Sequence, residues 1–172
     1  MRPVSAFQRL SHLAGSAAMG VSMLLLVYMV LHVTLEIVLR AGFASSTYSM
    51  DEYVGYAVGA MTFLSLADTF RQRRHIRVNL LLTHLRGKVA TACDALCILL
   101  TFGITAFLAR FIWRMLARDF ERGAVSPTLN QTPLWLVDGV IFLGLVLFMI
   151  QLAASLMDTL QHGYTAEDSR GD

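Results

Sequence analysis

Basic side chains are concentrated in one stretch of this sequence, RQRRHIRVNLLLTHLR at residues 71–86. Its first half holds five of them close together: Arg71, Arg73, Arg74, His75 and Arg77. Such a cluster can bind the phosphates of nucleic acid, take part in catalysis, or hold a segment against lipid headgroups. The elements on either side of the stretch decide among these functions.

Other residues whose side chains could take part in chemistry lie inside apolar runs. Glu36 is a carboxylate in such a run, which is where a proton-coupled transporter keeps an essential acid. His32 precedes it and Arg40 follows it, each at a spacing of four, so the three share one helix face and Glu36 can pair with Arg40. Cys93 and Cys97 stand four apart without a second pair, so the sequence predicts neither a disulfide framework nor a zinc site.

The composition of the chain is that of a membrane protein. Of its 172 residues, 56% are hydrophobic and 15% are charged, and the mean hydropathy is +0.59. In a soluble domain about a quarter of the residues are charged. The net charge of +2, from 14 basic and 12 acidic residues, says little, because the positions of the basic residues matter more in a membrane chain. We expect one membrane domain that covers residues 1–172.

Four apolar stretches meet or nearly meet the length that a helix needs to cross a bilayer. A hydrocarbon core of about 30 Å takes about 20 residues of helix. The stretches are residues 13–39, 53–70, 89–112 and 134–157. They leave no polar face for water, which argues against a soluble helical bundle. The predicted fold is an all-α integral membrane protein with four transmembrane helices and a polar cytoplasmic tail at residues 160–172.

The basic residues between these stretches predict the orientation of the chain. Nine fall on one side of the membrane: Arg2, Arg9, Arg71, Arg73, Arg74, Arg77, Arg86, Lys88 and Arg170. Five fall on the other: Arg40, Arg110, Arg114, Arg118 and Arg122. Because cytoplasmic connections are enriched in Arg and Lys, both termini should be cytoplasmic.

The 71–86 stretch is then first of all a topology signal, and it does not require nucleic acid as a partner. If it is helical, it is amphipathic and suited to the headgroup level. Its apolar face consists of Val78, Leu81, Leu82 and Leu85.

The outer ends of three predicted helices carry charges at a similar level. We expect an outer charge cluster formed by Glu36, Arg40, Arg110, Arg114 and Asp138. The alternative is that the arginines extend separately to lipid headgroups. Acidic and polar residues do not recur at matching midpoints of the stretches, so the sequence predicts no ion path of its own.

Small and aromatic residues indicate how the helices pack and where they stop. Gly55 and Gly59 form a G-x-x-x-G step on which another helix can pack closely. Trp135, after Pro133, is placed as an interfacial anchor for the last stretch. Gly123 is expected to end a helix that continues past the third stretch. We expect no catalytic, cofactor-binding or metal-binding residues.

Taken in order, these features resemble one family. The four stretches with both ends inside, RQRRHIRVNLLLTHL after the second and SPTLNQTPLWLVD before the fourth are similar to the small membrane subunit of tripartite ATP-independent periplasmic (TRAP) transporters, the DctQ-like family. The resemblance covers roughly residues 10–160, and its most specific part is His75-Ile76-Arg77-Val78. Asn79 is a departure, since the family more often has an acidic residue there.

The resemblance implies a function and partners. In that family an extracytoplasmic substrate-binding protein delivers an organic anion, often a carboxylate, to a pair of membrane proteins. The large polytopic subunit holds the substrate and sodium sites, so no cofactor is expected in the small one. The small subunit resembles a scaffold that holds the large subunit in the bilayer and presents part of the docking surface for the binding protein. The implied location is the bacterial cytoplasmic (inner) membrane, among membrane lipids.

Two other functions remain open from the residues alone. A stand-alone proton-coupled exporter would use Glu36 as the single essential carboxylate of a small four-helix dimer. Because Glu36 lies near the end of its stretch and four residues before Arg40, a paired carboxylate is favoured over a proton carrier. A membrane anchor for a redox enzyme would bind haem or quinone, but only His32 among the histidines lies within a stretch.

Overall fold

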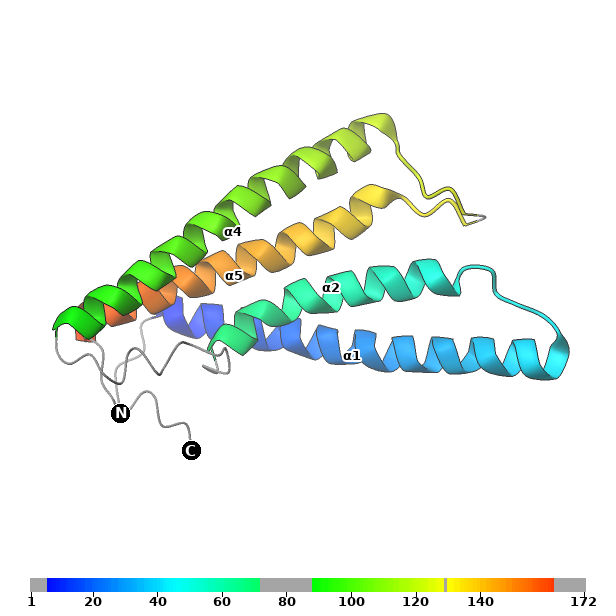
Figure 1. The fold of residues 1–172 in the computed structure, drawn as a ribbon, viewed down its shortest axis with the longest axis horizontal. Coiled ribbons are helices and arrows are strands. Elements are labelled where there is room, and N and C mark those ends of the chain that lie inside the picture. The colour runs from blue at the N-terminus through cyan, green and yellow to red at the C-terminus, as the bar shows by residue number, and fades with distance from the viewer. Residues whose placement is uncertain (1–5, 72–87, 129, 163–172) are drawn as a thin grey trace.

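The computed structural model of the chain describes residues 6–71, 88–128 and 130–162. These ranges form four helices: α1 (Ala6–Phe43), α2 (Met50–Arg71), α4 (Lys88–Arg122) and α5 (Leu134–His162) (Figure 1). The only β-type pairing within them is an isolated antiparallel bridge between Val125 and Pro133 in the α4–α5 connection. The all-helical class predicted from the sequence is confirmed.

Three of the helices are long and apolar enough to cross a membrane. These spans are Leu13–Phe43 in α1, Thr91–Arg122 in α4 and Leu134–Met157 in α5. They overlap three of the four stretches expected from the sequence. The fourth stretch forms α2, which is not among them, because Asp68 and several Gly, Ser, Thr and Tyr residues interrupt its apolar sequence. That α2 also crosses the membrane, and that both termini are cytoplasmic, stay predictions.

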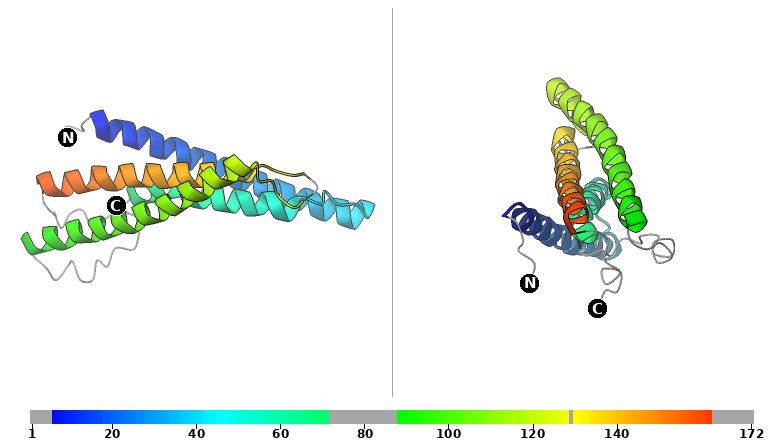
Figure 2. Two further views of the ribbon diagram at one scale, coloured as in Figure 1. Left: turned by 90° about the horizontal axis from the view of Figure 1, so that it is seen from above. Right: turned by 90° about the vertical axis from the view of Figure 1, so that its left-hand side faces the viewer.

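The helices form two antiparallel pairs. α1 packs along α2, and α4 packs along α5. α2 and α5 run parallel, side by side, and join the two pairs, while α1 meets α5 over a smaller area. Figure 2 shows α1 and α4 at separate margins of the bundle. The end that holds the α1–α2 and α4–α5 connections is referred to below as the outer end, after the predicted orientation, and the opposite end as the inner end.

The apolar core lies where α2, α4 and α5 meet in the inner half of the bundle. Its buried members are Ile98, Phe148 and Leu152, with Leu66, Phe70, Phe102 and Leu156 packed against them. The Phe70 and Phe148 rings meet edge to face, with centroids 5.7 Å apart. This cluster connects α2 of one pair to both helices of the other.

Large apolar side chains cover the outside of the bundle as well. On α1, Leu24 is 71% exposed and Leu31 is 64% exposed, and most of the other large side chains on that side are apolar too. A soluble protein rarely exposes a contiguous apolar surface of this extent. Lipid covers such a surface without cost, and the helices satisfy their own backbone hydrogen bonds, as a membrane requires.

α4 continues beyond residue 112, where the third predicted stretch ends, and stops at Gly123, as the sequence predicts. Gly123 has a φ of +58°, a left-handed conformation that glycine adopts without a steric penalty. The N–H of Ala124 donates to the Asp119 carbonyl at 2.9 Å, and that of Gly123 donates to the Phe120 carbonyl at 3.2 Å. This pair of bonds is a Schellman motif, and it turns the chain back toward α5.

Candidate functional site

Glu36 lies near the outer end of α1 and is 1% exposed. Its Oε1 accepts hydrogen bonds from Arg40 Nε at 2.7 Å and from the Ser46 hydroxyl at 2.5 Å. Its Oε2 accepts from the backbone N–H and the hydroxyl of Thr47, at 3.0 and 2.6 Å. The α1–α2 connection therefore folds back over a carboxylate that has four donors. Hydrogen bonds to an ionised group are the strong ones, so Glu36 fastens this connection to α1.

The spacing of the sequence predicts the contact between Glu36 and Arg40, but sequence reasoning missed Ser46 and Thr47. A signal was present in the run Ser45-Ser46-Thr47, directly after the end of the helix. Hydroxyl side chains in a turn commonly bond to nearby groups, and here the nearest acceptor is the buried acid one to two turns before the helix end.

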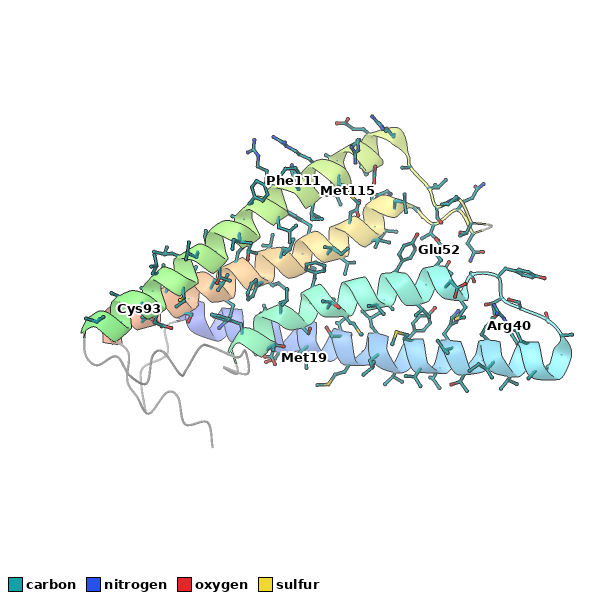
Figure 3. All side chains as sticks on the ribbon, in the orientation of Figure 1. Met19, Arg40, Glu52, Cys93, Phe111 and Met115 are labelled. Atoms are coloured by element: carbon teal, nitrogen blue, oxygen red, sulfur yellow. The ribbon has the colours of Figure 1, made fainter. Side chains whose placement is uncertain are left out.

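A second carboxylate, Glu52, ties α2 to the α4–α5 connection. Its Oε1 accepts a hydrogen bond from the Tyr56 hydroxyl at 2.8 Å, and its Oε2 accepts one from the Thr128 hydroxyl. Ser126 is 4% exposed, and its Oγ lies 3.1 Å from the hydroxyl of Thr128. We name these four residues, Glu52, Tyr56, Ser126 and Thr128, the outer clasp. Figure 3 shows Glu52 at the outer end of α2, close to the α4–α5 connection.

The contacts of the outer clasp lower the pKa of Glu52 from its ordinary value of 4.5. The hydrogen bond from Thr128 is the main cause, and partial desolvation opposes it. A second link runs beside the clasp, where the Asn130 side-chain amide donates to the Tyr53 hydroxyl at 3.3 Å. Sequence reasoning did not select Glu52, because its main partner lies 76 residues away in the chain.

Aromatic rings fill the space between α1 and α2 below these two carboxylates. The Tyr28 ring is stacked on the His32 ring, with centroids 5.5 Å apart. The Tyr53 ring meets the His32 ring edge to face, with centroids 6.3 Å apart. It also meets the Tyr56 ring edge to face, with centroids 6.5 Å apart. His32 therefore packs in an aromatic column, and its buried Nε2 has no hydrogen-bond partner among the residues that the structure describes. This column joins α1 to the residues of the outer clasp.

The residues expected to form one outer charge cluster lie in separate places. Glu36 and Arg40 form the ion pair described above. Asp138 on α5 is 4% exposed and lies close to Asp119 and Arg118 of α4. α1 and α4 share no helix–helix interface, so the described part of the chain does not bring Arg110 and Arg114 to Glu36.

Arg110 and Arg114 lie on the exposed side of α4. In the described ranges neither has a carboxylate within 4.0 Å, since the ion pairs found there are Glu36–Arg40 and Arg118–Asp119. Arg114 lies over the ring of Phe111, with its guanidinium carbon 5.9 Å from the ring centroid. Figure 3 shows Phe111 on the side of α4 that is turned away from α5. An arginine at the centre of a bilayer costs ~2.5–3.5 kcal/mol on insertion scales, so these two side chains need headgroups or a partner.

The closest helix packing occurs at Gly144 rather than at the expected G-x-x-x-G step. A Cβ at Gly144 would stand 2.6 Å from the carbonyl carbon of Phe63, so α2 and α5 approach each other closely only because this residue is glycine. A Cβ at Gly59 would meet only the tip of Ile141, at 3.8 Å, and one at Gly55 would meet nothing within 4 Å. In this chain Gly55 therefore lies outside the contact between the helix pairs.

The basic element, Arg71, Arg73, Arg74, His75 and Arg77, falls largely outside the described residues, and only the backbone of Arg71 is placed, at the end of α2. Trp135 packs edge to face on Phe120 of α4, with ring centroids 5.6 Å apart. At the inner end, the Thr159 hydroxyl donates to Asp94 Oδ2 at 3.0 Å, which links α5 to α4. No group of three or more His, Cys, Asp or Glu side chains that could hold a metal ion occurs within the ranges described.

Comparisons with known proteins give one match. The family described as "Tripartite ATP-independent periplasmic transporters, DctQ component" matches residues 29–162. The matched region contains the Glu36 site, the outer clasp and both helices of the α4–α5 pair. No curated protein and no solved structure matches the chain.

Proposed function

Because the chain belongs to the DctQ component family of tripartite ATP-independent periplasmic transporters, and is thus a small permease subunit, we propose that it is the scaffold of a sodium-coupled carrier for organic anions. In this proposal it holds the large subunit at a fixed depth and tilt in the cytoplasmic membrane while that subunit moves. It also contributes to the surface on which the substrate-binding protein docks. The carboxylate substrate and the sodium ions bind elsewhere, on the binding protein and the large subunit.

The observation that carries the proposal is the fastening of the two helix pairs to each other. Gly144 allows close packing of α2 on α5, and the outer clasp ties the start of α2 to the α4–α5 connection. Glu36 holds the α1–α2 connection in the same region. A scaffold has to keep its shape while its neighbour moves, and these contacts oppose movement of one pair relative to the other.

The proposal includes a topology. α2 runs antiparallel to α1 and buries Ala57, Leu64 and Ala67 against its neighbours, so we infer that it crosses the bilayer as a packed helix with a short apolar sequence. The excess of Arg and Lys in the N-terminal segment, the α2–α4 connection and the tail then supports cytoplasmic termini. The connections that carry Glu36's partners and the outer clasp would face the opposite side, where the substrate-binding protein arrives.

The stand-alone exporter is the less favoured function. It requires a carboxylate that can exchange a proton or a cation with the bilayer midplane. Glu36 instead lies near the end of its span and has a donor at each of four acceptor positions. No observation favours the redox anchor, which stays without support.

Copurification tests the proposal. The chain, with an affinity tag, is expressed together with the large polytopic protein of the same transporter, and the two are isolated in mild detergent. We expect the large protein to be retained, and organic-anion uptake by cells to require both. A chain that is isolated alone at every detergent concentration, with uptake unaffected by its deletion, would refute the scaffold function.

A further inference from the structure

The exposed sides of the two marginal helices differ in charge. α1 presents mainly large apolar side chains between Leu13 and Val38, a surface suited to lipid. α4 presents a mixed surface in which four exposed residues recur at positions 103, 107, 110 and 114. At about 100° per residue, Gly103, Phe107, Arg110 and Arg114 fall within a narrow sector of the helix. We name this sector the arginine face.

The arginine face is directed away from the bundle. The residues that α4 buries against its neighbours, Ile98, Thr105 and Ala109, lie on the opposite side of the helix. Phe107 is 66% exposed, and a Cβ at Gly103 would meet nothing within 4 Å. No part of the described chain therefore covers this face.

The contacts between α4 and α5 place the arginines along the span. Phe120 packs on Trp135, with ring centroids 5.6 Å apart, and Trp113 packs on Phe142, at 5.2 Å. Arg110 comes three residues before Trp113 in α4. Because α4 and α5 are antiparallel, Arg110 lies level with about the third residue after Phe142. That level is about ten residues, or about 15 Å along the axis, inward from Trp135. Arg110 thus lies beside a part of α5 that is within its membrane span, Leu134–Met157.

A charged face at this depth, without a counter-charge among the described residues of its own chain, matches a protein partner better than lipid tails. From these observations we infer that the arginine face is where the large subunit docks, and that the large subunit places at least one carboxylate against Arg110 and Arg114. The inference rests on the proposed scaffold function and assigns the side of the chain through which it acts. On the inner side of the two arginines, Gly103 leaves room for a partner helix to approach, and Phe107 provides a bulky apolar side chain on which the large subunit can pack.

Site-specific crosslinking in the intact complex tests the inference. A photo-crosslinking phenylalanine analogue is placed at Phe107 on the arginine face and, in a separate protein, at Leu31 on α1. We expect adducts with the large subunit from position 107, and lipid adducts from position 31. Adducts with the large subunit from position 31 alone, or only phospholipid adducts from position 107, would overturn the inference.

Charge variants give a second, independent measurement. The double variant Arg110→Gln with Arg114→Gln should retain about tenfold less large subunit on copurification, because the partner's carboxylate is left unpaired. The double variant Arg110→Lys with Arg114→Lys keeps the positive charge and should retain most of the large subunit. Arg122→Gln, at the end of α4, should not change the amount of large subunit retained. Equal retention by all three would overturn the inference. Failure of the scaffold proposal is distinguishable, because the unmodified chain would then retain no large subunit.

Discussion

Glu36 and Glu52 illustrate what a carboxylate at the outer end of this bundle does. Each accepts hydrogen bonds from hydroxyl groups of a connection, so each fixes a segment that would otherwise be free to move. The i,i+4 spacing predicts the Glu36–Arg40 contact, because both residues belong to one helix. The contact between Glu52 and Thr128 could not be predicted, because it depends on the path that the α4–α5 connection takes over α2.

Replacing Glu36 by Gln tests its structural function. The amide keeps one acceptor oxygen but loses the ion pair with Arg40 and turns an NH₂ group toward existing donors. We expect the melting temperature in detergent to fall by about 3–10 °C, in line with the loss of one or two charged hydrogen bonds. Glu121→Gln, at an exposed position near the end of α4, is the matched control and should melt like the unmodified protein. Equal melting of both variants would show that the Glu36 contacts contribute nothing to stability.

The outer clasp should give the protein a specific pH dependence. Because the folded state lowers the pKa of Glu52 from 4.5, its contribution to stability is fully present above 4.5 and is lost as the pH falls from there through the lower, folded pKa. The difference in melting temperature between the unmodified protein and Glu52→Gln should therefore shrink across that window. Asp51→Asn, the neighbouring exposed acid, should not reproduce the change. A difference that stays constant with pH would contradict the account of the clasp.

The helices themselves were the most predictable part of the molecule. Apolar runs marked the membrane spans of α1, α4 and α5, because lipid requires uninterrupted hydrophobic sequence. The extension of α4 to Arg122 was also predictable, from the glycine that ends it. The packing of the two helix pairs on each other could not be predicted. The G-x-x-x-G step drew attention to Gly55, whereas the close approach uses Gly144, and one sequence cannot tell which glycine faces a neighbour.

Alanine substitutions separate these two glycines. Gly144→Ala places a methyl group 2.6 Å from the carbonyl carbon of Phe63, so α2 and α5 must move apart. We expect a loss of about 1–3 kcal/mol in the free energy of unfolding, typical of overpacking. Gly55→Ala adds its methyl group in open space and should be neutral or slightly stabilising, because alanine favours helix. Reduced stability of Gly55→Ala with no effect of Gly144→Ala, measured by thermal unfolding, would reverse the assignment.

At the scale of the whole molecule, the chain consists of two helical pairs joined through α2 and α5 and fastened at the outer end. The predicted topology puts the outer clasp on the side where a binding protein would dock, and the basic 71–86 stretch on the cytoplasmic side. Both placements follow from the distribution of Arg and Lys, and labelling in a membrane tests them.

Cysteine labelling in intact cells tests this topology. With Cys93 and Cys97 replaced by alanine, a single cysteine is introduced as Asn79→Cys or, separately, as Ala124→Cys in the α4–α5 connection. We expect a membrane-impermeant maleimide to react with position 124 in intact cells and with position 79 only after the membrane is opened. The reverse pattern would invert the proposed orientation and place the outer clasp in the cytoplasm.

The central claim is that this chain holds a transporting neighbour and has no route of its own for solute. The most direct test is uptake into sealed vesicles that contain only this polypeptide, with an imposed sodium gradient and a radiolabelled organic acid that the complete transporter accumulates. We predict no accumulation above that of empty vesicles, and accumulation once the large subunit and the loaded binding protein are added. Accumulation by the isolated chain, abolished in Glu36→Gln, would contradict the account and identify a transporter in its own right.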